Sequence, residues 1–292
     1  MITKKRTPWL FMAPSMLLLL GLVVYPLYFA WKNAFYYWNL TTSPKPLQFI
    51  GLENFKNVFK LTPFKASFVN TIALSFSGIF IEFFIGFTIA LILSRDYLKT
   101  RLFRAIIILP TTIAPVVVGF LFLYLYFPNG GAFDWLLKII KFPVPAEGLL
   151  GSSKTALPSI VFADIWQWTP FFAIVLYAAI ISVPIDLLEA SEVDGASFFQ
   201  QIRNIYIPVI KPVASVIVML QFMRLFNTFD LVYVLTKGGP QTSTRTLSYS
   251  LYVEGLNNYN IGLASAFTIV MITIVNVIIG IYVFIFLRKR EW

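Results

Sequence analysis

Six apolar runs in this chain are each long enough to cross a membrane as a helix, and they constrain its fold more than any other feature. A hydrocarbon core about 30 Å thick is crossed by about 20 helical residues. The runs are continuous, whereas the strands of a membrane β-barrel would alternate apolar and polar residues. We therefore predict an all-α, polytopic membrane protein in which six transmembrane helices form a single domain over residues 1–292. The predicted spans are residues 9–31, 68–93, 105–127, 157–182, 212–234 and 263–287.

The composition agrees with a membrane protein and argues against several functions. Mean hydropathy is +0.78, and only 12% of the residues are charged, whereas about a quarter are charged in soluble domains. Cysteine and histidine are absent, which removes disulfides, cysteine metal sites and the usual proton shuttle. The sequence also contains no phosphate-binding glycine-rich loop. We predict no metal, no cofactor, no nucleic-acid partner and no enzymatic activity of the chain's own.

Lysine and arginine near the span ends predict the orientation in the membrane. With six spans both termini share one side, and the basic residues on that side lie in shorter connections than those on the other. Because positive charge concentrates in short cytoplasmic connections, we predict that both termini are cytoplasmic. The run at 9–31 is long for a signal peptide and is interpreted as a retained first span. The basic residues on the predicted cytoplasmic side are Lys4, Lys5, Arg6, Arg95, Lys99, Arg101, Arg104, Arg203, Lys211, Arg288, Lys289 and Arg290.

An acidic segment lies in the predicted cytoplasmic loop 183–211, between the fourth and fifth spans. Four carboxylates precede Gly195 there, as in a short helix that the glycine ends. A second short helix follows, with Ser197 as its cap and an apolar stripe, and Pro208 and Pro212 are expected to end it before the fifth span. We predict two short helices joined at a glycine elbow. The carboxylates are Asp186, Glu189, Glu192 and Asp194, and the stripe is Phe198, Phe199, Ile202, Ile205 and Tyr206.

The apolar stripe has two explanations, contact with lipid or contact with a protein. Helices on a membrane surface usually carry Lys and Arg on the polar face, where they meet anionic lipid. Here the polar residues are four carboxylates, with only Arg203 and Lys211 as bases. The pattern therefore favours docking of the segment into a groove of a protein partner.

The acidic segment resembles the EAA loop of permease subunits in binding-protein-dependent ABC importers. That loop reads Glu-Ala-Ala, three residues, Gly, nine residues, Ile-x-Leu-Pro. In this chain Ser191 replaces the second Ala and Ile207 replaces the Leu, and the spacing matches in full. The matching residues are Glu189, Ala190, Ser191, Asp194, Gly195, Ala196, Ile205, Ile207 and Pro208.

A second segment, residues 227–266, resembles the Gly-Gly-Pro region of the first, MalF-like permease in the carbohydrate uptake branch of these importers. With the six spans and the length, the resemblance covers nearly the whole chain and implies a MetI-like permease bundle in a prokaryotic cell membrane. The large extracytoplasmic insert and extra N-terminal helices of the maltose protein are lacking. The matching residues are Phe229, Asp230, Tyr233, Thr236, Gly238, Gly239, Pro240, Thr246, Leu247, Tyr252, Gly262, Ala264 and Ala266.

The resemblance implies that the elbow is a coupling helix seated in a cleft of an ATPase subunit. Glu189 would meet a basic group there, and the small Ala190 and Ser191 would allow close approach. Gly195 would permit the bend, and Pro208 would connect it to the fifth span. The implied partners are a second homologous permease, two ATPase subunits, an extracytoplasmic solute-binding protein and a sugar. The remaining coupling residues are Asp194, Phe198 and Phe199.

Two charged residues are predicted at similar depth inside the spans. Glu82 lies near the middle of the second span and Arg224 in the fifth. Because unpaired charges in a bilayer are costly, we predict an interhelical ion pair between them. The pair could stabilise packing or take part in gating.

Polar and aromatic side chains in the fourth and fifth spans suggest a sugar pathway. Sugars need hydrogen-bonding groups for their hydroxyls and flat apolar rings for their C–H faces. Interfacial anchoring is the alternative explanation, since Trp and Tyr concentrate at membrane boundaries. The candidate pathway residues are Asp164, Trp166, Gln167, Trp168, Asn227, Asp230 and Tyr233.

The predicted function is that of the membrane-spanning permease of an ATP-driven importer of a sugar or oligosaccharide. Importers of glycerol phosphate or another polyol are an alternative. A secondary transporter driven by an ion gradient is the rival from a different class. Such carriers usually show an internal repeat, which this sequence does not clearly contain.

Overall fold

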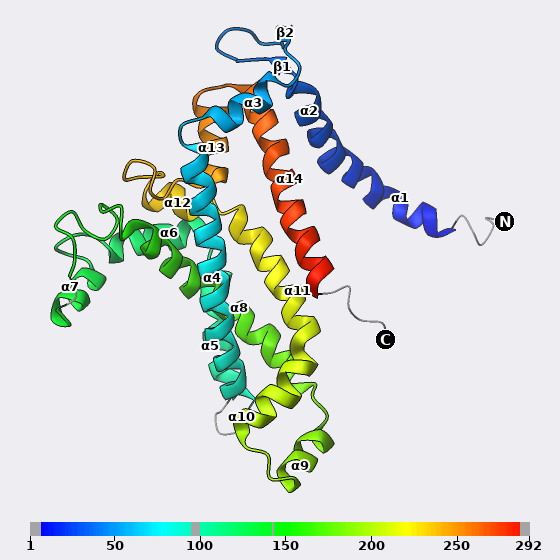
Figure 1. Ribbon diagram of the computed structural model, residues 1–292, viewed down its shortest axis with the longest axis vertical. Coiled ribbons are helices and arrows are strands. Elements are labelled where there is room, and N and C mark those ends of the chain that lie inside the picture. The colour runs from blue at the N-terminus through cyan, green and yellow to red at the C-terminus, as the bar shows by residue number, and fades with distance from the viewer. Residues whose placement is uncertain (1–6, 95–99, 142, 287–292) are drawn as a thin grey trace. The chain divides into compact units, whose positions relative to one another are not determined.

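The computed structural model describes residues 7–94, 100–141 and 143–286 and is mostly helical (Figure 1). Within these described residues, five helical segments are long and apolar enough to cross a membrane, or six if a bent helix pair is counted as one span. Several sequence predictions lie outside the described residues: the span end at Leu287 and the flanking bases Lys4, Lys5, Arg6, Arg95, Lys99, Arg288, Lys289 and Arg290. The five segments are Phe11–Asn33, Phe64–Leu93, Ala156–Ile181, Phe198–Leu235 and Ile261–Phe286.

The first span is a helix with one irregular turn. A π-helical turn, η1 (Leu20–Val24), joins α1 (Thr7–Leu19) to α2 (Tyr25–Asn33). It directly precedes the first turn of α2, which contains Pro26. A local π adjustment of this kind lets a membrane helix continue past a residue that lacks an N–H donor.

The third predicted span, 105–127, is not one straight helix. It consists of α5 (Thr100–Thr112) and α6 (Pro115–Leu125), and the two are bent by 98°. The residue before a proline is pushed away from helical angles, and Ala114 accordingly has φ −59° and ψ 137°. The prediction of one continuous run was wrong here because it counted apolar residues and ignored Pro115.

The helix after the elbow continues into the fifth span. It runs through α10 (Phe198–Gln201), η2 (Ile202–Tyr206) and α11 (Ile207–Phe226). The prediction that Pro208 and Pro212 end a separate short helix was therefore wrong. Pro208 lies in the first turn of α11, where its missing N–H costs little, and the π-turn η2 directly precedes that turn. Pro212 lies inside the helix.

The chain divides into two compact units, of which the first comprises the described parts of Met1–Phe64 and Ser250–Ile274. Its antiparallel hairpin pairs β1 (Tyr36–Tyr37) with β2 (Gln48–Phe49) and leads into α3 (Glu53–Lys60). Buried Asn54 donates to Ala34 O at 2.9 Å and to Tyr36 O at 2.8 Å. This unit also contains η3 (Val253–Asn257) and the first part of α14 (Ile261–Phe286).

The second unit comprises the described parts of Lys65–Tyr249 and Val275–Trp292. Its core lies where α4 (Phe64–Leu93), α8 (Ala156–Ile181) and α11 pack together. A Cβ placed on Gly86 would lie 2.5 Å from Phe172 Cβ, so the glycine allows α4 and α8 to approach closely. The remaining elements here are α7 (Ala132–Ile139), α9 (Ile185–Val193), α12 (Asp230–Leu235) and the first half of α13 (Leu247–Tyr252).

Candidate functional site

A cluster of charged side chains joins the three helices that form the core of the second unit, α4, α8 and α11. Arg224 on α11 forms two bonds to Asp164 on α8, from Nη1 to Oδ1 and from Nη2 to Oδ2, each 2.8 Å long. Arg224 Nη2 also lies 3.3 Å from Oε1 of Glu82 on α4. The structure thus places Glu82 beside Arg224, as the sequence predicts, and adds Asp164 as a closer, bidentate partner. Planar carboxylate and guanidinium groups in this arrangement form strong, directional bonds.

Gln221 completes the cluster from the same helix as Arg224. Its Nε2 donates to Glu82 Oε2 at 2.9 Å, and its Oε1 accepts from Arg224 Nε at 3.0 Å. Glu82, Asp164 and Gln221 are all buried. The sequence reasoning missed Gln221, although residues three apart share a helix face and this spacing could have indicated it.

A small polar cleft of about 150 Å³ opens beside the cluster. The structure gathers five of the seven predicted pathway residues at this cleft. The rest of the lining is Arg224, Pro115, Thr228, Phe229 and Leu231. Because Pro115 lies at the bend between α5 and α6, this bend borders the cleft. The five predicted residues are Asp164, Gln167, Trp168, Asn227 and Asp230.

Trp168 and Gln167 each have a structural partner in addition to facing the cleft. The guanidinium carbon of Arg224 lies 4.4 Å from the centre of the Trp168 ring, which gives a cation–π contact. Gln167 Nε2 donates at 2.8 Å to Ile113 O, a carbonyl at the break between α5 and α6. Gln167 Oε1 is buried and accepts no hydrogen bond from the described part of the chain. Gln167 therefore bonds the bend through its amide nitrogen, and its amide oxygen is buried without a partner among the described residues.

The other two predicted pathway residues lie away from the cleft lining. Trp166 packs edge-on against Phe122, with ring centres 5.5 Å apart. Tyr233 stacks on Phe229 at 5.3 Å. Any role of Trp166 and Tyr233 in a pathway stays a prediction.

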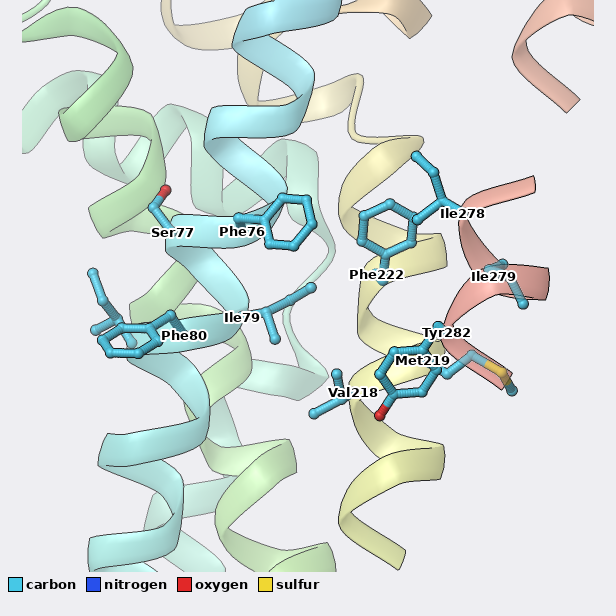
Figure 2. A pocket seen from close by; sticks show the side chains of 11 residues that line it. Phe76, Ser77, Ile79, Phe80, Val218, Met219, Phe222, Ile278, Ile279 and Tyr282 are labelled. Carbon is cyan, nitrogen blue, oxygen red and sulfur yellow. The ribbon is translucent and has the colours of Figure 1, made fainter. Parts of the chain in front are cut away.

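A larger pocket of about 530 Å³ lies between α4, α11 and the C-terminal part of α14 (Figure 2). Aliphatic and aromatic side chains surround it, including Phe76, Phe80 and Phe222. Its hydroxyls are engaged elsewhere: Tyr282 donates to Ser215 O at 3.0 Å, and Ser77 donates to Ala73 O at 2.5 Å. This pocket is larger than the polar cleft, but its lining offers little for a polyhydroxylated solute to bond.

The glycine elbow is formed as the sequence predicts. Helix α9 ends at Val193, and Gly195 follows with φ +72°, a left-handed conformation that glycine adopts easily. Ser197 then caps α10 in a capping box with Gln200: Ser197 N donates to Gln200 Oε1 at 2.7 Å, and Gln200 N donates to Ser197 Oγ at 3.4 Å. Gln201 donates to the Ser191 hydroxyl at 3.0 Å, which ties the two arms together.

The outer surface of the elbow is open. The four carboxylates are exposed, as are Val193 at 87% and Phe199 at 79%. Among the described residues none of the four carboxylates forms a salt bridge. Glu189, Ala190 and Asp194 are exposed, Ser191 is half-buried, and Phe198 contacts Phe199 edge-on at 6.0 Å. The elbow thus exposes both acidic and large apolar side chains.

The Gly-Gly-Pro segment forms a turn, as expected for that composition. Gly238 has φ +81°, and Gly239 N donates to Thr236 O at 3.0 Å. Thr244 donates to Gly239 O at 2.7 Å. Asn70 of α4 donates to the carbonyls of Thr242 and Arg245 at 2.8 Å and 3.1 Å, which fixes the loop beside α4.

Comparison with known proteins gives a family match over most of the chain. The model of the family described as binding-protein-dependent transport system inner membrane component matches residues 82–291. The trehalose/maltose transport system permease protein MalF of Thermococcus litoralis is 34% identical over 73% of this chain and 70% of its own length. The trehalose transport system permease protein SugA of Mycobacterium tuberculosis is 30% identical over 98% of this chain and 90% of its own.

A solved structure has the same fold over nearly the full length. It is a chain of a bacterial ABC transporter involved in the import of the acidic polysaccharide alginate. The two chains superpose with a TM-score of 0.83 and share 25% identity, and the match covers 97% of this chain and 96% of the other.

Proposed function

This chain belongs to the family of binding-protein-dependent transport system inner membrane components, and on that premise we propose that it is the membrane-spanning permease of an ATP-driven importer of a sugar or oligosaccharide. The relatives and the solved structure named above carry trehalose, maltose or alginate in their names. Transport of a carbohydrate is therefore the function that the family and the cleft support together.

The observation that carries the proposal is the geometry of the elbow. A partner that pushes on α9 would act on a helix that runs from Phe198 through α11 to Arg224. At about 1.5 Å per residue this helix reaches about 40 Å from the elbow to the charge cluster. The charge cluster borders the polar cleft. A movement at the elbow thus has a rigid path to the place where a solute would pass.

The proposed partners are those that membership of this family implies. The exposed acids and aromatics of α9 and α10 fit a groove with basic residues in an ATPase subunit. Two ATPase subunits, a second homologous permease and an extracytoplasmic solute-binding protein complete the proposed importer. In this arrangement both termini and the elbow face the cytoplasm, and ATP hydrolysis takes place in the partner subunits.

Co-expression and reconstitution test the proposal. We expect the chain to co-purify in mild detergent with an ATPase subunit and a second permease, and to give little folded protein when expressed alone. In proteoliposomes the assembled complex should take up a sugar only when ATP and the loaded binding protein are both present. Uptake by the lone chain, driven by an ion gradient, would instead indicate a secondary carrier.

A further inference from the structure

We propose that the polar cleft selects an uncharged carbohydrate and discriminates against anionic solutes such as sugar phosphates, polyol phosphates and uronates. This inference rests on the proposed function and narrows its substrate class. The charges and hydrogen-bonding groups of the cleft lining support it.

Arg224 is the only basic residue in the described lining of the cleft, and four of its five donors are already used. A guanidinium has five N–H donors. Four are engaged: one with Gln221, two with Asp164 and one with Glu82. Trp168 covers one face of the group. A phosphate or carboxylate on a solute would have to compete with two protein carboxylates for this cation.

The remaining charge at the cleft is negative. Asp230 lines it and forms no hydrogen bond or salt bridge with the described residues through its side chain. Asp164 and Asp230 together outnumber Arg224 in the lining. Since the field in a confined site falls off less than in bulk water, an anion entering here meets repulsion without a free counter-ion.

Helix α6 begins at the cleft, and a helix N-terminus usually attracts anions. Here that attraction is reduced. Pro115 occupies the first position of α6 and has no N–H. The N–H groups of Val117 and Val118 both point back to Ala114 O, at 2.9 Å and 3.1 Å.

Two acceptors at the cleft are available to a solute. Asp230 offers its carboxylate there, whereas the unbonded Oε1 of Gln167 is buried. Asn227 donates from its Nδ2 to Met223 O at 2.8 Å. Its side-chain oxygen, Oδ1, can then accept a hydrogen bond from a solute. A site rich in acceptors needs donors from its solute, and sugar hydroxyls supply them. Phosphate dianions and carboxylates have only acceptors to offer.

Matched neutral and anionic disaccharides test the inference on the detergent-solubilised complex of both permeases and the ATPase subunits, without the binding protein. The probes are maltose, trehalose and cellobiose, each compared with its 6-phosphate by saturation-transfer difference NMR. We expect at least one neutral sugar to bind about tenfold or more tightly than its phosphate, because like charges in a site are strongly unfavourable. Asp230→Asn should reduce this ratio. Asp186→Asn, which removes an exposed carboxylate on the elbow, should leave the ratio unchanged.

Three results would overturn the inference: phosphates that bind as well as the neutral sugars, a ratio that Asp230→Asn does not change, or no binding by any neutral probe. None of these results touches the proposed function itself. That function is judged separately by ATP-dependent uptake with the loaded binding protein.

Discussion

The charge cluster and the glycine elbow are both rich in carboxylates, but these carboxylates are buried and paired in the cluster and exposed at the elbow. In the cluster, Glu82 and Asp164 are buried and bonded to Arg224. At the elbow, four carboxylates are exposed, and none forms a salt bridge within the described chain. A buried charge must be paired inside the protein, because its desolvation is costly. An exposed charge has no such need, so a dense group of them beside exposed aromatics calls for an explanation outside the chain.

This difference separates the expected effects of substitution. Changes in the cluster should lower folding stability and transport together, because the same bonds join three helices and border the cleft. Changes at the elbow should leave the fold intact and affect only the response to ATP. The predictions below test that separation, beginning with the largest expected change in the free energy of unfolding.

Replacing Arg224 with Leu should have the largest effect. Glu82 and Asp164 would remain buried without a cation, which typically destabilises a protein by about 3–5 kcal/mol. We expect the variant to give little monodisperse complex in size-exclusion chromatography and a clearly lower midpoint of thermal unfolding. Lys211→Leu removes an exposed cation from the same helix and serves as the matched control. Equal behaviour of both variants would show that the cluster does not stabilise the fold.

Double-mutant cycles should rank the two carboxylates. The cycle of Asp164→Asn with Arg224→Gln should give a larger coupling energy than that of Glu82→Gln with Arg224→Gln. Asp164 makes two bonds of 2.8 Å to the guanidinium, whereas Glu82 makes one of 3.3 Å. Both couplings should fall between about 0.5 and 3 kcal/mol when measured by thermal unfolding in detergent. Strictly additive effects in either cycle would show that the two residues of that pair do not interact. A larger coupling energy for Glu82 than for Asp164 would contradict the observed geometry.

The sequence was sufficient for the features that depend on composition and short spacing. Apolar runs predicted the first, second, fourth and sixth spans to within a few residues, and the pairing of Glu82 with Arg224 followed from the cost of lone charges in a bilayer. The left-handed Gly195 and the Ser197 cap also depend on local chemistry, and both are found. What these predictions share is that each involves one helix, one turn or one strongly unfavourable group.

The errors have two sources, local proline chemistry that was read wrongly and tertiary contacts that the sequence does not reveal. Pro115 breaks the third span, and a side chain from α8, Gln167, bonds the carbonyl at the break. Pro208 was expected to end a helix, but a proline in the first turn costs little, and the helix continues. Asp164 was assigned only to the solute pathway, because the sequence does not reveal which carboxylate is closer to Arg224.

Gly195→Val should destabilise the elbow only locally. Gly195 has φ +72°, and a Cβ there would meet no atom within 4 Å, so any penalty comes from the backbone alone. A left-handed conformation costs an ordinary residue about 1–2 kcal/mol, and β-branched residues adopt it rarely. We expect normal insertion and normal yield of the complex, with sugar-stimulated ATP hydrolysis and uptake falling together in proteoliposomes.

Gly195→Asn is the matched control for Gly195→Val. Since Asn tolerates positive φ, this variant should behave nearly like the wild type. Full uptake by the Val variant would mean that the bend is not needed for coupling.

Glu189→Lys should have the smallest effect on stability and still reduce transport. Glu189 is exposed and makes no salt bridge with the described residues, so its replacement breaks no contact of this kind within the chain. If the elbow sits in a basic groove of an ATPase subunit, the new lysine meets like charge there, and association weakens. We expect an unchanged unfolding midpoint for the permease in the solubilised complex, less ATPase subunit in the purified complex and slower uptake. An acidic substitution in the groove of the ATPase should restore part of both the assembly and the uptake.

Asp186→Lys is the control, because it makes the same change in net charge three residues earlier on α9. An identical loss in that variant would indicate general electrostatic attraction. A loss confined to Glu189→Lys would indicate a specific contact. Normal assembly and uptake with Glu189→Lys would mean that this carboxylate has no partner in the importer.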